Sequence, residues 1–87
     1  MAISSGQLTV GTASVAIDGV WQGPSRITIQ NLDNSDTVFI GNSNVSTTNG
    51  LGLTKLEMIQ FDLGPLEQLH AVSTKSNHTI SWLRQTI

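Results

Sequence analysis

The chain contains 87 residues, no cysteine, and a net charge of −2 from four basic and six acidic side chains. This length corresponds to one domain, and the lack of cysteine excludes disulfides and cysteine-based zinc sites. Four scattered cations cannot neutralise a series of phosphates, so we expect no nucleic-acid partner. No apolar run approaches the roughly 18 residues of a membrane span, so we expect no membrane partner. The N-terminus lacks the pattern of a signal peptide, which predicts synthesis in a cytoplasm.

The low charge of the chain determines the character of its surface. Only 11% of the residues are charged, against about 25% in typical soluble domains. Serine, threonine, asparagine and glutamine make up 32 of the 87 residues and must cover most of the exterior. Such a surface can be buried against a neighbour without stripping water from ions. We therefore expect self-association, with copies packed side by side.

The N-terminal segment, residues 1–7, is polar except for Ile3. We expect it to be an arm that precedes a single β-sandwich domain spanning residues 8–87. Such an arm is either a frayed terminus or a strand that adds to the sheet edge of a neighbouring molecule. Leu8 and Val10 alternate with a polar residue and mark the first strand of the domain.

Two short apolar runs follow, separated by a turn signal. Residues 13–17 and 20–21 flank Asp18-Gly19, and an Asp-Gly step between apolar runs is a strong signal for a β-hairpin. Gly23-Pro24 ends the second run, because proline cannot donate to a sheet ladder. The next strand, residues 26–30, alternates isoleucine with polar residues and is the clearest half-buried strand in the sequence.

The second half of the chain continues with a period of two. Strands are expected at residues 37–40, 55–63, 69–73 and 79–85, separated by turn-forming residues. Short strands at this spacing predict an all-β fold, an antiparallel β-sandwich or small jelly-roll-like barrel of about seven to eight short strands. A helix at residues 53–60 is the less favoured alternative, since the apolar residues there keep alternating.

The two tryptophans admit different interpretations. Trp82 shares a strand face with Ile80 and is expected in the core, while Leu83 points to the opposite face. Trp21 precedes a Gly-Pro turn and could serve a subunit or partner interface, stack on a sugar ring, or pack in the ordinary way. Leu83 and Trp21 are therefore candidates for a second apolar surface.

Between residues 41 and 51 the chain forms a loop of small, polar and turn-forming side chains. Asn42, Asn44 and Asn49 of this loop, together with Trp21, are candidates for an inter-subunit or receptor surface. The loop contains no nucleophile beside a base, no metal-ligand set and no phosphate cradle. It therefore indicates an interaction rather than a reaction.

Candidate catalytic and metal-binding residues are few. His70 and His78 could be cross-strand neighbours, but no cysteine or adjoining carboxylate motif completes a metal site. A Gly-x-Ser-x-Gly elbow is absent. Two carboxylate pairs lie in or next to turn signals, where turn capping is the expected role: Asp33 with Asp36, and Asp62 with Glu67. We expect a protein that is not an enzyme and that needs neither a metal nor a cofactor.

Five segments within residues 26–85 form a recognisable pattern. Val-Phe-Ile-Gly at 38–41 leads into a Thr/Asn/Gly loop that ends at Gly50, and Leu-Thr-Lys-Leu-Glu and Phe-Asp-Leu-Gly follow. Leu-His-Ala-Val-Ser-Thr, beginning at Leu69, precedes the closing Thr-Ile-Ser-Trp, which begins at Thr79. This pattern resembles a family of small virion proteins of tailed bacteriophages. The family has a V-[FY]-I-G strand before such a loop, then an L-x-A-[VI]-[ST] strand and a final x-[VI]-x-[VW]-L strand.

The resemblance implies a β-sandwich of jelly-roll character, commonly trimeric, that decorates the outside of a capsid or forms a module of head or tail fibres. It carries no catalytic residues. The decoration role is favoured, because a trimeric fibre shaft would show heptads or repeats. We accordingly expect a homotrimer on the outer surface of the virion head, bound to the major capsid protein after synthesis in the host cytoplasm.

Two sets of residues carry this expectation. Ile3, Ser4 and Ser5 are expected to contact the capsid, while Trp21 and the asparagines of the 42–50 loop contact sister copies or the surroundings. The alternative function is a head-fibre, tail-fibre or collar module that binds a host receptor. In that case Trp21 and the three asparagines would form a carbohydrate surface.

Overall fold

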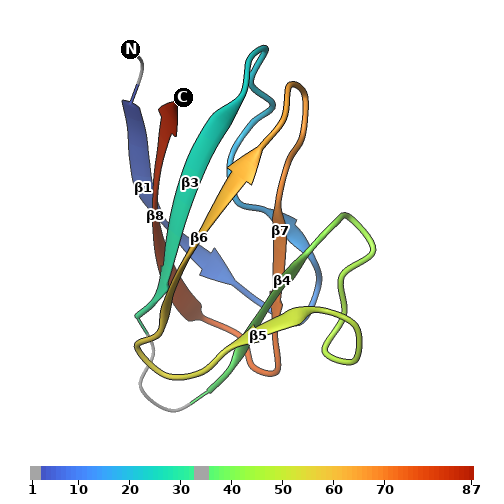
Figure 1. Cartoon of the computed structure of the whole chain (residues 1–87). Helices are drawn as coiled ribbons and strands as arrows, with labels where there is room; N and C mark the ends of the chain where they lie inside the picture. The colour runs from blue at the N-terminus through green and yellow to red at the C-terminus, as the bar shows by residue number, and fades with distance from the viewer. Residues whose placement is uncertain (1–2, 33–35) are drawn as a thin grey trace.

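The computed structural model describes residues 3–32 and 36–87, and in this part the chain forms two four-stranded antiparallel sheets (Figure 1). The first sheet has the strand order β1-β8-β3-β6 and the second β2-β7-β4-β5. The nested pairing of early with late strands is that of an eight-stranded jelly roll, so the predicted antiparallel β-sandwich is confirmed. The strands are β1 (Ile3–Val10), β2 (Val15–Ala16), β3 (Ser25–Asn31), β4 (Val38–Gly41), β5 (Leu51–Leu53), β6 (Met58–Leu63), β7 (His70–Ser73) and β8 (His78–Thr86).

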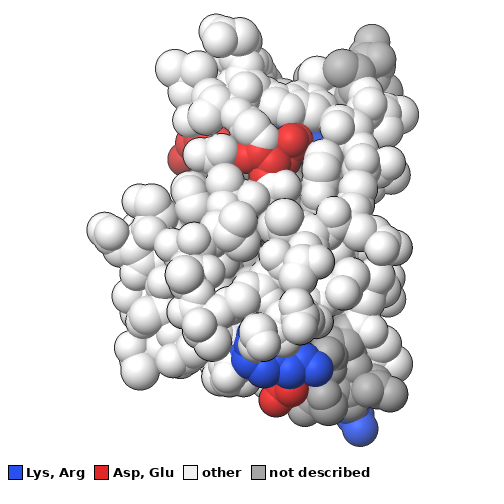
Figure 2. All heavy atoms as spheres, turned by 180° about the vertical axis from the view of Figure 1, so that it is seen from behind, with Lys and Arg blue, Asp and Glu red and all other residues white. Residues whose placement is uncertain are grey.

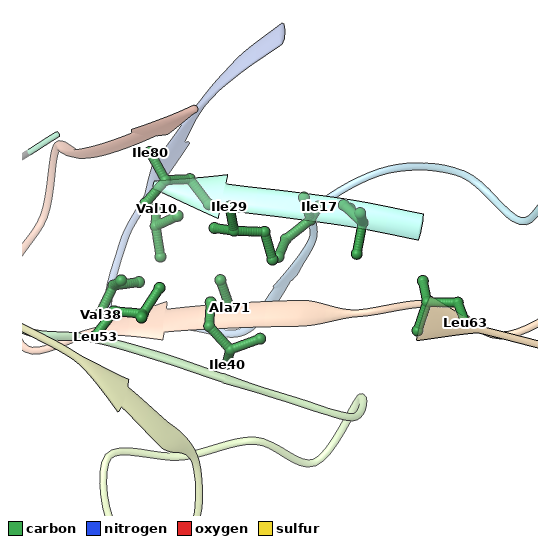
Figure 3. Close-up of a cluster of buried hydrophobic side chains, with 10 residues drawn as sticks. Val10, Ile17, Ile29, Val38, Ile40, Leu53, Leu63, Ala71 and Ile80 are labelled. Carbon is green, nitrogen blue, oxygen red and sulfur yellow. The ribbon is translucent and has the colours of Figure 1, made fainter. Parts of the chain in front are cut away.

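Aliphatic side chains from both sheets fill the space between them (Figure 3). Alternation along β3 points Ile27 and Ile29 inward, where both are fully buried, as the sequence predicts for residues 26–30. Burial of each such side chain contributes about 1.5 to 3 kcal/mol. The other buried members of this core are Val10, Ile17, Val38, Ile40, Leu53, Leu63, Ala71 and Ile80.

The N-terminal segment belongs to the first sheet. β1 pairs with β8 along its whole length, from Ile3 opposite Gln85 to Val10 opposite His78. Residues 3–7, which the sequence suggests are an arm, are thus the beginning of a continuous edge strand. Residues 1 and 2 of the expected arm lie outside the described residues.

The hairpin expected around Asp18-Gly19 does not form, and that prediction is wrong. β2 pairs with β7, with Val15 opposite Ala71, and residues 20–21 are not a strand. The physical reason is the Asp18 carboxylate, which accepts hydrogen bonds from the Gly19 N–H (2.7 Å) and the Trp21 indole (3.2 Å). These bonds hold the segment as a loop that covers one end of the sandwich.

The strand expected at residues 55–63 begins at Met58, because a turn occupies residues 54–57. One carboxylate oxygen of Glu57 accepts from both the backbone N–H and the hydroxyl of Thr54, each at 2.6 Å. Leu56 in this turn has a φ of 59°, a left-handed conformation. The described residues include no helix at 53–60 or elsewhere. No helix in the described ranges is long and apolar enough to cross a membrane.

A buried polar network closes the end of the sandwich near the β7–β8 turn. The imidazole of His78, which is fully buried, lies 2.8 Å from the Ser73 hydroxyl and 2.7 Å from the Asn31 side-chain oxygen. The Asn31 amide in turn donates to three backbone carbonyls at 3.0 to 3.1 Å, those of Asp36, Leu53 and Thr54. Asn31 therefore links β3 of the first sheet to β5 of the second.

We expect Asn31→Ala to lower the free energy of unfolding by about 2 to 3 kcal/mol, because it leaves several buried polar groups without their partner. Asn44→Ala, in an exposed loop, is the matched control and should change stability by less than about 0.5 kcal/mol. Urea unfolding of the two variants and the wild type measures both effects. Equal stability of the two variants would show that the network contributes nothing.

Candidate interaction surface

The first sheet contains the four longest strands of the described chain, each longer by two residues or more than any strand of the second sheet, and we call its outer side the neutral face. Its side chains are those opposite to the buried positions of the same strands, because successive residues of a strand point to opposite sides. They form three rows that cross β1, β8, β3 and β6 in that order. The rows are Ile3, Gln85, Arg26 and Asp62; Ser5, Leu83, Thr28 and Gln60; and Gln7, Ser81, Gln30 and Met58.

Three exposed apolar side chains lie among the hydroxyl and amide groups of this face. Ile3 is 63% exposed, Met58 65% and Leu83 43%. The exposure of Leu83 agrees with the prediction that it points away from Ile80, which is fully buried. A shallow hollow of about 530 Å³ crosses the face over all four strands, with Leu83 and Met58 on its walls. A surface of this kind, apolar in part and poor in ions, resembles the central area of protein interfaces.

The neutral face carries one ion pair, whose two charges cancel each other. Arg26 Nε donates to Asp62 Oδ1 at 2.8 Å across the β3–β6 pair. The hydrogen bond from Arg26 lowers the pKa of Asp62 below the ordinary carboxyl range, and Asp62 likewise raises the pKa of Arg26. Figure 2 shows the molecule from behind relative to Figure 1. On that side, charged side chains are confined to small groups near the two ends of the molecule. Arg26 and Asp62 are the charged side chains of the three rows, so the neutral face has no net charge.

Arg84 organises one end of the sandwich, and the sequence assigned it no role. Its side chain is 1% exposed, and its nitrogen atoms donate to the Ser25 hydroxyl (2.8 Å), the Gly19 carbonyl (2.7 Å) and the Glu67 carbonyl (3.2 Å). The inward position of residue 84, in step with Ile80 and Trp82 on β8, is the signal that could have predicted its burial.

Trp21 belongs to this Arg84 cluster and not to the neutral face. Its ring lies 4.6 Å from the guanidinium carbon of Arg84, a cation–π contact, and its indole N–H is bonded to Asp18. Its backbone carbonyl accepts from the Leu66 N–H at 2.8 Å. Trp82 packs against the hydrophobic core as predicted, though it is only half-buried.

The loop at 42–50 folds around a side chain of its own. Val45 is buried (7% exposed), and a Cβ on Gly50 would lie 2.7 Å from its methyl group, so the loop closes tightly over it. Asn42 Oδ1 accepts from the Asn44 N–H, and Asn49 Oδ1 accepts from the Ser46 N–H. The amide oxygens of Asn42 and Asn49 thus hold the loop together.

The structure does not gather the predicted binding residues into one place. The loop of Asn42, Asn44 and Asn49 joins β4 to β5 of the second sheet (Figure 1). Trp21 instead contacts Arg84 on β8 of the first sheet. Ile3 and Ser5 lie on the neutral face, and Ser4 points to the inner side of the same strand, where it is half-buried. Of the predicted sets, the N-terminal one therefore contributes two residues to the candidate surface.

The candidate metal and carboxylate residues stay apart. His78 lies in the first sheet, opposite Val10, and His70 in the second, opposite Gly41. His70 Nδ1 is buried without a hydrogen-bond partner in the described part of the chain. Asp62 pairs with Arg26, and Glu67 accepts from the Gly64 N–H, a turn-capping contact; Asp33 lies outside the described residues. No group of three or more potential metal-ligating side chains occurs within residues 3–32 and 36–87.

Comparison with known proteins identifies a fold and no family. No protein-family model matches the chain, and no curated protein is similar to it. A solved structure described as "Bacillus endospore appendages form a novel family of disulfide-linked pili" superposes with a TM-score of 0.59 over 99% of this chain and 86% of that chain. The two are 12% identical, which shows a common fold alone.

We expect Arg84→Met to destabilise the protein by about 3 to 5 kcal/mol, because it leaves buried carbonyls and the Asp18 carboxylate without their cation. Arg26→Met removes the exposed arginine of the neutral face and should change stability little. Guanidinium unfolding of both variants compares them directly. Equal losses would mean that the burial of Arg84 does not matter.

Two exposed carboxylates predict a weak acid sensitivity. Arg26 lowers the pKa of Asp62, and the Thr54 hydroxyl and N–H lower that of Glu57. A lowered pKa stabilises the folded state above the unfolded values of about 3.9 and 4.3, and this stabilisation is lost as the pH falls through the folded values. The thermal midpoint should fall as the pH is lowered below about 5, and the Asp62→Asn/Glu57→Gln variant should show a shallower fall. An unchanged acid profile in that variant would contradict this assignment.

Proposed function

We propose that the chain is a non-enzymatic structural protein of a tailed-bacteriophage virion. In this role it binds the major capsid protein on the outer surface of the assembled head as a homo-oligomer and stabilises the shell. The sequence resemblance motivates the viral context. The observation that carries the structural part is the neutral face, with Ile3, Met58 and Leu83 exposed among uncharged polar side chains.

The neutral face suits a permanent contact better than it suits chemistry. Burial of hydroxyl and amide groups costs little where the partner offers hydrogen bonds, whereas burial of ions costs several kcal/mol each. Arg26 and Asp62 already neutralise each other, so the face can be covered without leaving a lone charge. Of the residues predicted to contact the capsid, Ile3 and Ser5 have exposed side chains on the neutral face, which is compatible with the proposed contact.

The proposed stabilisation follows from mass action. A protein that binds only the assembled lattice lowers the free energy of that lattice and leaves the free subunits unchanged. Many copies, each with a modest affinity, would then raise the temperature at which the shell opens. No catalytic step and no cofactor is required.

A fibre or collar module is the second candidate, with a host receptor or carbohydrate as its ligand. A solved structure of similar fold is described as forming pili, but at 12% identity that likeness concerns the fold alone. The disulfide linkage in that description has no counterpart here, since the chain has no cysteine. Asn42, Asn44 and Asn49 are all exposed, but the amide oxygens of Asn42 and Asn49 accept hydrogen bonds within the loop, so Asn44 offers the side chain that a sugar could reach. Trp21 contacts Arg84 instead.

The test uses heads of the encoding phage that were assembled without this chain. Purified protein is added, unbound protein is removed by sedimentation, and the heads are imaged by electron microscopy and then heated. We expect regular density on the outer surface and a higher opening temperature. Heads that bind no protein, or that open at the same temperature with and without it, would contradict the proposal.

A matched pair of variants locates the contact. Leu83→Lys places a charge in the neutral face and should weaken head binding by roughly tenfold or more. Val20→Lys is the control, since Val20 is similarly exposed (51%) but lies in a loop outside that face. Equal binding by the two variants would exclude the neutral face as the contact. Specific binding to a glycan array, lost in Asn44→Ala, would favour the receptor-binding alternative.

A further inference from the structure

β1 is a long edge strand without the usual protection against pairing. It has eight residues, Ile-Ser-Ser-Gly-Gln-Leu-Thr-Val, with no charged residue and no proline. Natural sheet edges are commonly blunted by charges, prolines, bulges or short strands. The other edges of this protein follow that rule: β2 and β5 have two and three residues, and β6 carries Asp62 and is followed by Pro65. β1 is therefore the edge that remains available.

The backbone groups that β1 turns outward can be identified from its neighbours. Leu32 N donates to the Thr79 carbonyl and Ile87 N to the Pro24 carbonyl, so the odd-numbered residues of β8 direct their N–H and C=O groups toward β3. The even-numbered residues of β8 then bond to β1. Through the β1–β8 register, the residues of β1 whose backbone groups point away from the sheet are Ile3, Ser5, Gln7 and Thr9.

This free edge is complementary to itself. Two copies related by a two-fold axis through Gly6 place Ile3 opposite Thr9 of the second copy, and Ser5 opposite Gln7. All four residues with outward backbone groups then form hydrogen-bonded pairs, and every outward side chain meets another outward side chain. Gly6 faces itself where antiparallel strands approach most closely. No charge is buried, because β1 has none.

We propose that β1 is a pairing surface for a second copy of this chain, joined antiparallel and centred on Gly6. The two first sheets then form one eight-stranded sheet, and the two neutral faces lie side by side on the same side of it. Such a contact is isologous and closes at two copies. The pairing deepens the self-association in the proposed function, and gives two copies in place of the three that the resemblance implies.

Sedimentation equilibrium of the purified chain tests the proposal without any particles, so it is independent of head binding. The expected mass is twice that of the 9.3 kDa chain at millimolar concentration, with dissociation on dilution. A mass of one chain at millimolar concentration, or a mass of three chains, would overturn the proposal. If the wild-type chain forms dimers but does not bind heads, that result would count against the proposed function and not against the pairing.

Charge variants test the register. Ser5→Lys/Gln7→Lys sets like charges opposite each other twice in the pair, and should raise the dissociation constant roughly tenfold or more. Ser5→Lys/Gln7→Glu sets opposite charges against each other at the same positions and should restore pairing. Equal dissociation constants for the two variants would overturn the register.

A proline variant tests the use of the edge itself. Ser5→Pro removes an N–H that points away from β8, so the folded chain should persist while pairing weakens at least tenfold. Ser5→Ala keeps that N–H and is the matched control. Circular dichroism confirms the fold of each variant. Undiminished pairing of a folded Ser5→Pro chain would exclude β1 as the contact, and if that variant unfolds, the two charge variants decide the outcome.

Discussion

The alternation of side chains along β8 is the constraint on which both sides of this protein depend. β8 has nine residues and lies between β1 and β3 in the first sheet. Its inward positions carry the fully buried Ile80 and the two polar side chains that hold the ends of the sandwich, His78 and Arg84. Its outward positions supply Leu83 and neutral polar groups to the opposite side. A slip of one residue in its pairing would exchange these two sets.

Buried polar side chains, and not additional hydrophobic ones, hold the two ends of the sandwich together. Arg84 binds carbonyls from the loops on either side of it, and Asn31 connects the two sheets beside His78. In each network, side chains from the strands hydrogen-bond to the backbone of neighbouring loops and fix those loops against the sheets. Because these inner networks hold the ends of the sandwich, the outer side of the first sheet can consist of small uncharged groups, as a contact surface requires.

The sequence predicts those parts of the fold that follow from a period of two. The strand at Ile27 and Ile29, the antiparallel sandwich and the outward position of Leu83 were all predictable, because alternation alone decides them. The expected Asp18-Gly19 hairpin failed because Asp18 bonds to Trp21 and lies beside Arg84, and a partner 66 positions away cannot be read from a local turn signal. The sequence predicted that the surface would be rich in uncharged polar residues. It could not show which of these residues form the neutral face, because the strand order determines which rows lie side by side. Trp21 and the asparagine loop were predicted to form a binding surface because the sequence does not reveal their contacts within the chain, with Arg84 for Trp21 and with loop backbone for the asparagines.

Residue-resolved hydrogen exchange of the β1 amides tests most directly the claim that this edge and its face serve assembly. In dilute solution the amides of Ser4, Gly6 and Leu8, which bond to β8, should be protected, and those of Ser5, Gln7 and Thr9 should exchange rapidly. At high concentration the second set should become protected as well, while the first set remains unchanged. Rapid exchange of Ser5, Gln7 and Thr9 at every concentration would contradict the account.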